Sequence, residues 1–127
     1  MKTILLLPAG IALGAASWAI CGAVTGKFEP FDNTTGFFLC QTVLALPMLI
    51  LGLRAGTLRA LLCLLGAWAG MNAYAYLFGS SETRAWIVLL LFSSLTLLVF
   101  PAIAAIGGGI VRASRRRPRA HAGTPAD

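Results

Sequence analysis

The sequence predicts an all-α membrane protein, a bundle of four transmembrane helices that run up-down-up-down with both termini in the cytoplasm. The chain has 127 residues, of which 58% are hydrophobic and 11% charged. A soluble globular domain has about 45–50% apolar and about 25% charged residues. Four long stretches contain no Asp, Glu, Lys or Arg. The basic residues, finally, collect on one side of a four-span arrangement, which indicates its orientation.

The four spans are expected at residues 4–24, 36–53, 60–78 and 85–106. A bilayer core of about 30 Å needs about 20 apolar residues as a helix, and each stretch is close to that length. In lipid every backbone polar group must be bonded internally, which helices achieve. We expect one transmembrane domain over residues 1–111, with Gly107, Gly108 and Gly109 fraying its last helix. A disordered, basic cytoplasmic tail, rich in Arg, Ala and Pro, is expected over residues 112–127.

The first span has an alternative interpretation as a signal peptide. Met1 and Lys2 precede an apolar run over residues 4–16, and Ser17-Trp18-Ala19 is a loose cleavage site. The apolar run continues to Val24, however, and this full length favours a retained transmembrane helix.

The distribution of basic residues sets the predicted orientation. One side carries eight of the ten Lys and Arg residues: Lys2, Arg54, Arg59, Arg112, Arg115, Arg116, Arg117 and Arg119. The other side has Lys27 and Arg84. The positive-inside rule therefore places both termini in the cytoplasm. The net charge of +6 is then a topology signal, and no nucleic-acid partner is expected. Arg115, Arg116 and Arg117 are candidates for contact with anionic lipid head groups, although a topology anchor alone explains them too.

Glycines four residues apart predict two helix-packing faces. Gly10 and Gly14 share a face of the first span, and Gly66 and Gly70 share a face of the third. Small residues let two helix backbones approach closely, which favours association in lipid. Packing within one bundle is expected in preference to dimerisation.

Polar side chains in the outer half of the bundle form a candidate pocket, comprising Ser17, Gln41, Asn72, Tyr74 and Ser93. Lipid cannot satisfy the amide donors and acceptors, so we expect these residues to face inward. They either bind a neutral ligand or hold the helices together, and the second role is the more common.

Two cysteines, Cys21 and Cys40, are expected at similar depth on consecutive spans. A disulfide is conceivable if the compartment is oxidising and the Cα atoms come within about 7 Å. Buried free thiols are the alternative. There is no C-x-x-C pair, and the chain has one histidine. Neither a metal nor a cofactor is therefore expected.

The longest outer loop, residues 25–35, is a candidate partner-binding surface. It carries Phe28, Glu29, Phe31 and Asp32 close together. An interfacial aromatic belt explains part of this, but the cytoplasmic side has few aromatic residues.

The function predicted from these features is non-catalytic. We expect a bacterial inner-membrane protein that serves as an accessory or assembly subunit of a larger membrane complex, binding through helix faces and the outer Phe-rich loop. The alternative is an oligomeric transporter or channel for a neutral or amphiphilic solute. The expected partners are the bilayer and another membrane protein or a second copy of the chain. No acid, base or metal cluster falls inside a span, so an enzyme is not expected.

Overall fold

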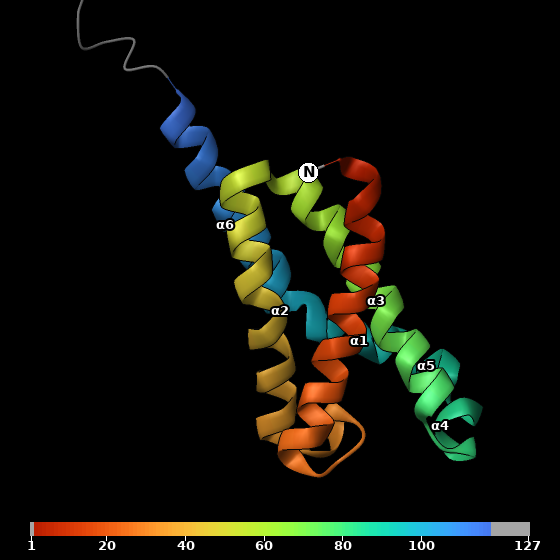
Figure 1. Ribbon diagram of the computed structural model, residues 1–127. Coiled ribbons are helices and arrows are strands. Elements are labelled where there is room, and N and C mark those ends of the chain that lie inside the picture. The colour runs from red at the N-terminus through yellow and green to blue at the C-terminus, as the bar shows by residue number, and fades with distance from the viewer. Residues whose placement is uncertain (1, 118–127) are drawn as a thin grey trace, which may run out of the picture.

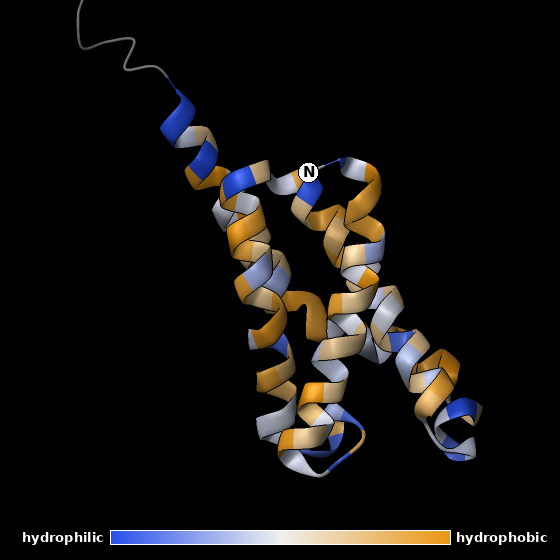
Figure 2. Cartoon of the chain, viewed as in Figure 1, coloured by the Kyte–Doolittle hydropathy of each residue, from blue (hydrophilic) through white to orange (hydrophobic). Residues whose placement is uncertain are grey.

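The computed structural model describes residues 2–117, and every regular element in that range is helical (Figure 1). The elements, with η for 3₁₀ helices, are η1 (Thr3–Leu5), α1 (Leu6–Thr25), η2 (Pro30–Asp32), α2 (Thr34–Ala55), α3 (Thr57–Phe78), α4 (Ser81–Ala85), α5 (Ile87–Ser93), η3 (Ser94–Leu98) and α6 (Val99–Arg116). Four helical segments are long and apolar enough to cross a membrane: Thr3–Asp32, Thr34–Ala55, Thr57–Phe78 and Ile87–Arg116. Apolar residues cover these segments, and polar residues gather at the connections and at the end of α6 (Figure 2). The chain thus has the make-up of a multi-pass membrane protein.

Local sequence explains where the first helices end. Gly26 closes α1 in the left-handed conformation with φ of 71°, which costs a residue without a Cβ little. Asn33 caps α2, because its side-chain oxygen accepts hydrogen bonds from the backbone N–H groups of Thr35 at 2.8 Å and Gly36 at 3.4 Å. Gly56, with φ of 100°, alone separates α2 from α3. The second connection is therefore a one-residue turn.

The tightest contact of α1 is with α3, along the two predicted glycine faces. A Cβ atom added to Gly10 would collide with the backbone of Cys63 and Ala67, and one added to Gly14 with the backbone of Ala67. From the other side, a Cβ on Gly66 would meet the carbonyl oxygen of Leu7 at 2.6 Å. The glycines thus bring the two backbones into direct contact, and the structure uses them inside one chain.

A second glycine seam joins α2 to α6. A Cβ on Gly52 would lie 2.6 Å from the carbonyl oxygen of Ala105 and 3.1 Å from the nitrogen of Gly109. Gly108 faces the backbone of α2 in the same way. The expectation that residues 107–109 fray the helix was wrong, because the close contact with α2 offsets the low helix propensity of glycine.

The fourth span is broken rather than continuous over 85–106 as expected. The helix α4 ends at Ala85, and the 3₁₀ turn η3 separates α5 from α6. The hydroxyl of Ser94 donates to the carbonyl of Leu91 at 3.0 Å, and that of Thr96 to the carbonyl of Ser93 at 2.6 Å. Pro101 lacks an N–H group and disfavours a regular helix through the preceding turn. Figure 1 shows the consequence, since α5 lies beside α3 whereas α6 lies beside α2.

The helix α6 extends to Arg116, so the first part of the expected disordered tail is ordered. Its last turn contains Ala113 and basic residues, which have high helix propensity. The Nε group of Arg112 donates to the carbonyl of Arg54 at 3.1 Å and ties this turn to the end of α2. Arg115, Arg116 and Arg117 are exposed. The rest of the tail, residues 118–127, lies outside the described residues.

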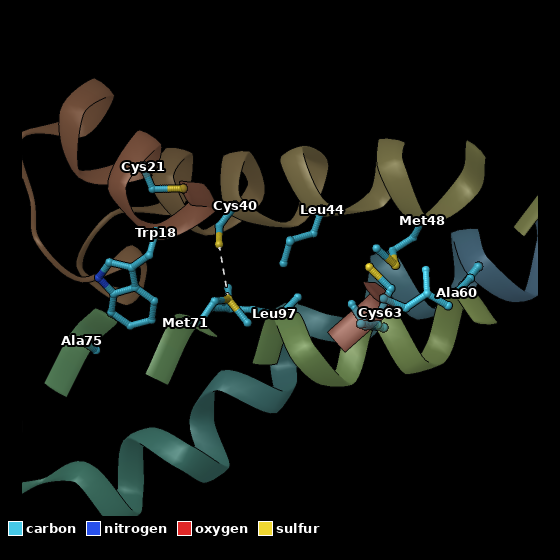
Figure 3. Packing of buried hydrophobic residues seen from close by; sticks show 14 of the residues in the cluster. Trp18, Cys21, Cys40, Leu44, Met48, Ala60, Cys63, Met71, Ala75 and Leu97 are labelled. Atoms are coloured by element: carbon cyan, nitrogen blue, oxygen red, sulfur yellow. Dashed lines mark hydrogen bonds between the residues drawn. The ribbon is translucent and has the colours of Figure 1, made fainter. Parts of the chain in front are cut away.

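The centre of the bundle is filled by large apolar and sulfur-containing side chains. Trp18, Cys40, Leu44, Met48 and Met71 have no exposed surface. Figure 3 shows them in a row between the helices, where the Cys40 thiol contacts the Met71 sulfur at 3.9 Å.

Candidate functional site

A cavity lies at one end of the bundle, here called the loop end. The α1–α2 connection and the segment from Ser80 into α5 meet there. The cavity has a volume of about 630 Å³. Its lining combines acidic, aromatic and hydroxyl side chains: Phe28, Glu29, Phe31, Asp32, Ser80, Glu82, Thr83, Trp86, Leu89, Leu90 and Ser93. All four residues of the predicted partner loop are among them.

A short hydrogen-bond network holds the two sides of the cavity together. Ser80 caps α4, because its hydroxyl oxygen accepts from the backbone N–H of Thr83 at 3.3 Å. The hydroxyl of Thr83 donates to Oε1 of Glu29 at 3.2 Å, across 54 positions of sequence. The loop is thereby tied to the start of the fourth span, and the cavity has a defined shape.

Aromatic side chains form one wall of the cavity and the layer beneath it. Phe28 and Phe31 pack on Trp18, with ring centroids 6.1 Å and 6.3 Å away. Phe28 also stacks on Tyr74 at 6.1 Å, and Tyr74 contacts Phe78 at 4.8 Å. The loop phenylalanines are therefore partly buried and fix the loop on α1 and α3.

The charge of the cavity is negative. Glu29, Asp32 and Glu82 all line it, and among the described residues no Lys or Arg does so. The nearest arginine in sequence, Arg84, is used elsewhere. Its guanidinium donates to the carbonyls of Tyr76 at 2.8 Å and Leu77 at 3.3 Å.

The structure does not unite the five residues of the predicted polar pocket, and of these five only Ser93 lines the cavity. Ser17 donates to the carbonyl of Gly14 at 2.7 Å within its own helix. The Oε1 atom of Gln41 accepts from the backbone N–H of Phe100 at 3.3 Å, just after the break in the fourth span. Gln41 thus supports an interrupted helix.

Asn72 likewise holds helices together. Its Nδ2 atom donates to the carbonyl of Trp68 at 2.8 Å and to the Ser94 hydroxyl at 3.0 Å. The Trp68 indole donates to the same hydroxyl at 2.9 Å and to the carbonyl of Leu91 at 3.2 Å. This cluster joins α3 to the broken span. Sequence reasoning missed the role of Trp68, whose spacing of four from Asn72 places both on one helix face.

The two candidate disulfide residues lie next to each other. Both Cys21 and Cys40 are buried as free thiols, and the Cys40 thiol contacts the Ser17 hydroxyl at 3.6 Å. Figure 3 shows the Cys21 sulfur directed toward Cys40, whose own sulfur points to Met71 of α3.

The opposite end of the bundle carries most of the positive charge. The one-residue turn at Gly56 is flanked by Arg54 and Arg59, and the end of α6 adds Arg112 and the three exposed arginines that follow it. Within residues 2–117, no group of three or more His, Cys, Asp or Glu side chains is placed to hold a metal ion.

Comparison with protein-family models, curated proteins and solved structures finds no match to this chain. The cavity at the loop end, defined by its geometry and charge, is therefore the candidate site.

Proposed function

We propose that this chain is a bacterial inner-membrane protein that acts without catalysis as an accessory or assembly subunit of a larger membrane complex. In this proposal the four spans alternate in direction and both termini are cytoplasmic. The loop end then faces outward and receives a partner membrane protein. The separation of charge supports this orientation, because basic residues gather at one end and Glu29, Asp32 and Glu82 at the other.

The observation that carries the proposal is the shaped cavity at the loop end. A cavity of about 630 Å³ falls within the range of about 300–1,000 Å³ that is typical of binding sites. Trp86 and Leu89, on its lining, are 63% and 59% exposed. Exposed aromatic and apolar residues next to charged ones are typical of the residues that contribute most to binding at protein–protein interfaces.

The test is recovery of a partner from the native membrane. The tagged chain is extracted in mild detergent and its complexes are weighed by native mass spectrometry. We expect a foreign membrane protein at a fixed ratio. Trp86→Ala should reduce recovery at least fivefold, whereas Phe92→Ala, which removes a 69% exposed aromatic residue outside the cavity, should not. A clean monomer, or equal recovery with both variants, would contradict the proposal.

The predicted orientation has its own test. Reporter fusions at Ser81 and after Asp127 should report opposite compartments, with the C-terminal fusion cytoplasmic. An external C-terminus would reverse every statement about sidedness.

A second candidate function, a transporter or channel for a neutral or amphiphilic solute, is favoured by the broken fourth span. Interrupted helices in membranes often surround a substrate path. Here, however, the orphan N–H of Phe100 is bonded by Gln41, and Ser94 is occupied by Asn72 and Trp68. If transport were the function, the purified protein would self-associate without a foreign partner and would move solute in proteoliposomes.

A further inference from the structure

We propose that the cavity at the loop end binds an organic cation, that is, an ammonium or guanidinium group attached to an apolar body. This cavity is the same binding site as in the proposed function. The biological purpose of cation binding rests on that proposed function, but the binding itself does not. Two features of the described residues carry it: the acidic lining and the aromatic wall.

The acidic lining comes from two separate segments. Glu29 and Asp32 belong to the α1–α2 connection, and Glu82 to α4. Glu29 is held in place by the hydroxyl of Thr83. A neutral hydroxyl does not offset a negative charge, so the acidic side chains depend on solvent or on a ligand for compensation. Like charges that converge on one cavity attract a cation more strongly than any one of them alone.

The aromatic wall suits the organic part of such a ligand. Phe28, Phe31 and Trp86 line the cavity together with Leu89 and Leu90. The faces of aromatic rings attract cations, and the attraction grows when water is displaced. A small hydrated metal ion would gain little from these apolar groups, whereas an alkylammonium or guanidinium group on an apolar body contacts both kinds of surface.

Neighbouring cations leave the cavity free. Lys27 is exposed and does not line it. Arg84 is held over the Tyr76 ring, 5.7 Å from its centroid, by hydrogen bonds to backbone carbonyls. The negative charge is therefore available to an incoming group.

The experiment uses the full chain in nanodiscs of uncharged lipid and isothermal titration with benzyltrimethylammonium. This probe joins a permanent positive charge to an aromatic ring. We expect saturable binding at one site. Benzyl alcohol, which keeps the ring without the charge, should bind at least tenfold more weakly, and benzoate should not bind.

Variants of the lining separate charge from shape. Glu29→Gln keeps an acceptor for Thr83 and removes the charge, and Glu82→Gln removes a charge from the exposed surface of α4. Each should weaken probe binding about fivefold, the scale of one solvent-accessible ion pair, and lower its sensitivity to salt. Asp127→Asn removes the same charge from the end of the chain and should leave binding unchanged. Thermal melting of each variant confirms that the fold is retained.

Two results would overturn the inference: equal binding of benzyl alcohol and the cationic probe, or affinity unchanged in both glutamine variants. Because the isolated chain is titrated, this failure is distinct from failure to recover a partner. Addition of the probe to a recovered complex then identifies the source of the cation. Release of the partner assigns it to a Lys or Arg side chain of that partner, and simultaneous binding assigns it to a free solute.

Discussion

The contact between α1 and α3 makes a quantitative prediction for Gly14→Ala. The added Cβ would lie 2.6 Å from the carbonyl carbon and 2.7 Å from the Cα of Ala67, where carbon atoms normally stay about 3.5–4.0 Å apart. These are backbone atoms, which cannot rotate away, so the helices must separate by about 1 Å. A gap of that size forfeits a quarter to a half of the dispersion energy along the seam. Overpacking of this kind costs about 1–3 kcal/mol.

Alanine also favours the helical state over glycine by about 0.5–1 kcal/mol, which acts in the opposite direction. We therefore expect a net loss of about 1–2 kcal/mol in the free energy of unfolding. Gly107→Ala is the matched control, because it is the same substitution in a helix and its Cβ would meet nothing within 4 Å. Only the propensity gain applies there, and this variant should be slightly stabilised.

The assay is reversible unfolding in mixed detergent micelles, followed by tryptophan fluorescence and circular dichroism. If Gly14→Ala were at least as stable as the wild type, backbone contact between α1 and α3 would be refuted. Equal destabilisation by both variants would show instead that glycine is required for a reason unrelated to the seam.

The remaining predictions concern the broken span and the thiols. Gln41→Leu leaves the N–H of Phe100 without an acceptor and should cost about 1–3 kcal/mol in the same assay; wild-type stability would show that this N–H has another acceptor. Ser94→Ala removes the shared partner of the amide and indole donors of α3 and should destabilise by about 1–3 kcal/mol; wild-type stability would show that this cluster is solvated. A thiol oxidant that partitions into micelles should join Cys21 to Cys40, seen as a mass loss of two hydrogens, and Cys21→Ser should abolish it; absence of the product in the wild type would place the thiols apart.

Charge-free apolar length was sufficient to predict the first three helices. The ends of the expected ranges 4–24, 36–53 and 60–78 lie within three residues of the ends of α1, α2 and α3. The capping residue Asn33 and the terminal Gly26 lie just outside the apolar runs, which is why composition located those ends well.

The fourth span shows the limit of composition. Residues 85–106 are as apolar as the others, and hydropathy carries no information about a helix that breaks within the run. The signals were local: Ser94, Thr96 and Pro101 close together. Such residues interrupt a helix only where another group bonds the freed backbone N–H and C=O groups. Here that group is the side chain of Gln41, which lies 59 positions away from Phe100 in the sequence.

One side of the candidate site, the loop between α1 and α2, could be predicted from the sequence. The loop residues Phe28, Glu29, Phe31 and Asp32 form a continuous segment, so their pattern is visible in the sequence. The opposite side of the cavity comes from residues 80–93, and the Thr83–Glu29 hydrogen bond that positions it spans 54 residues. The two amides of the predicted polar group, Gln41 and Asn72, have separate partners, the N–H of Phe100 and the hydroxyl of Ser94.

The two glycine seams have a consequence for biogenesis. Each joins helices that are not neighbours in the sequence, α1 with α3 and α2 with α6. A chain that enters the membrane from its N-terminus places α1 and α2 in lipid before either has its close-packing partner. The glycine faces of α1 and α2 therefore contact lipid until the third and fourth spans enter the membrane. A ribosome-bound chain that ends before α6 should leave α2 open to proteolysis or to capture by an insertion factor, although α1 and α3 are already in place.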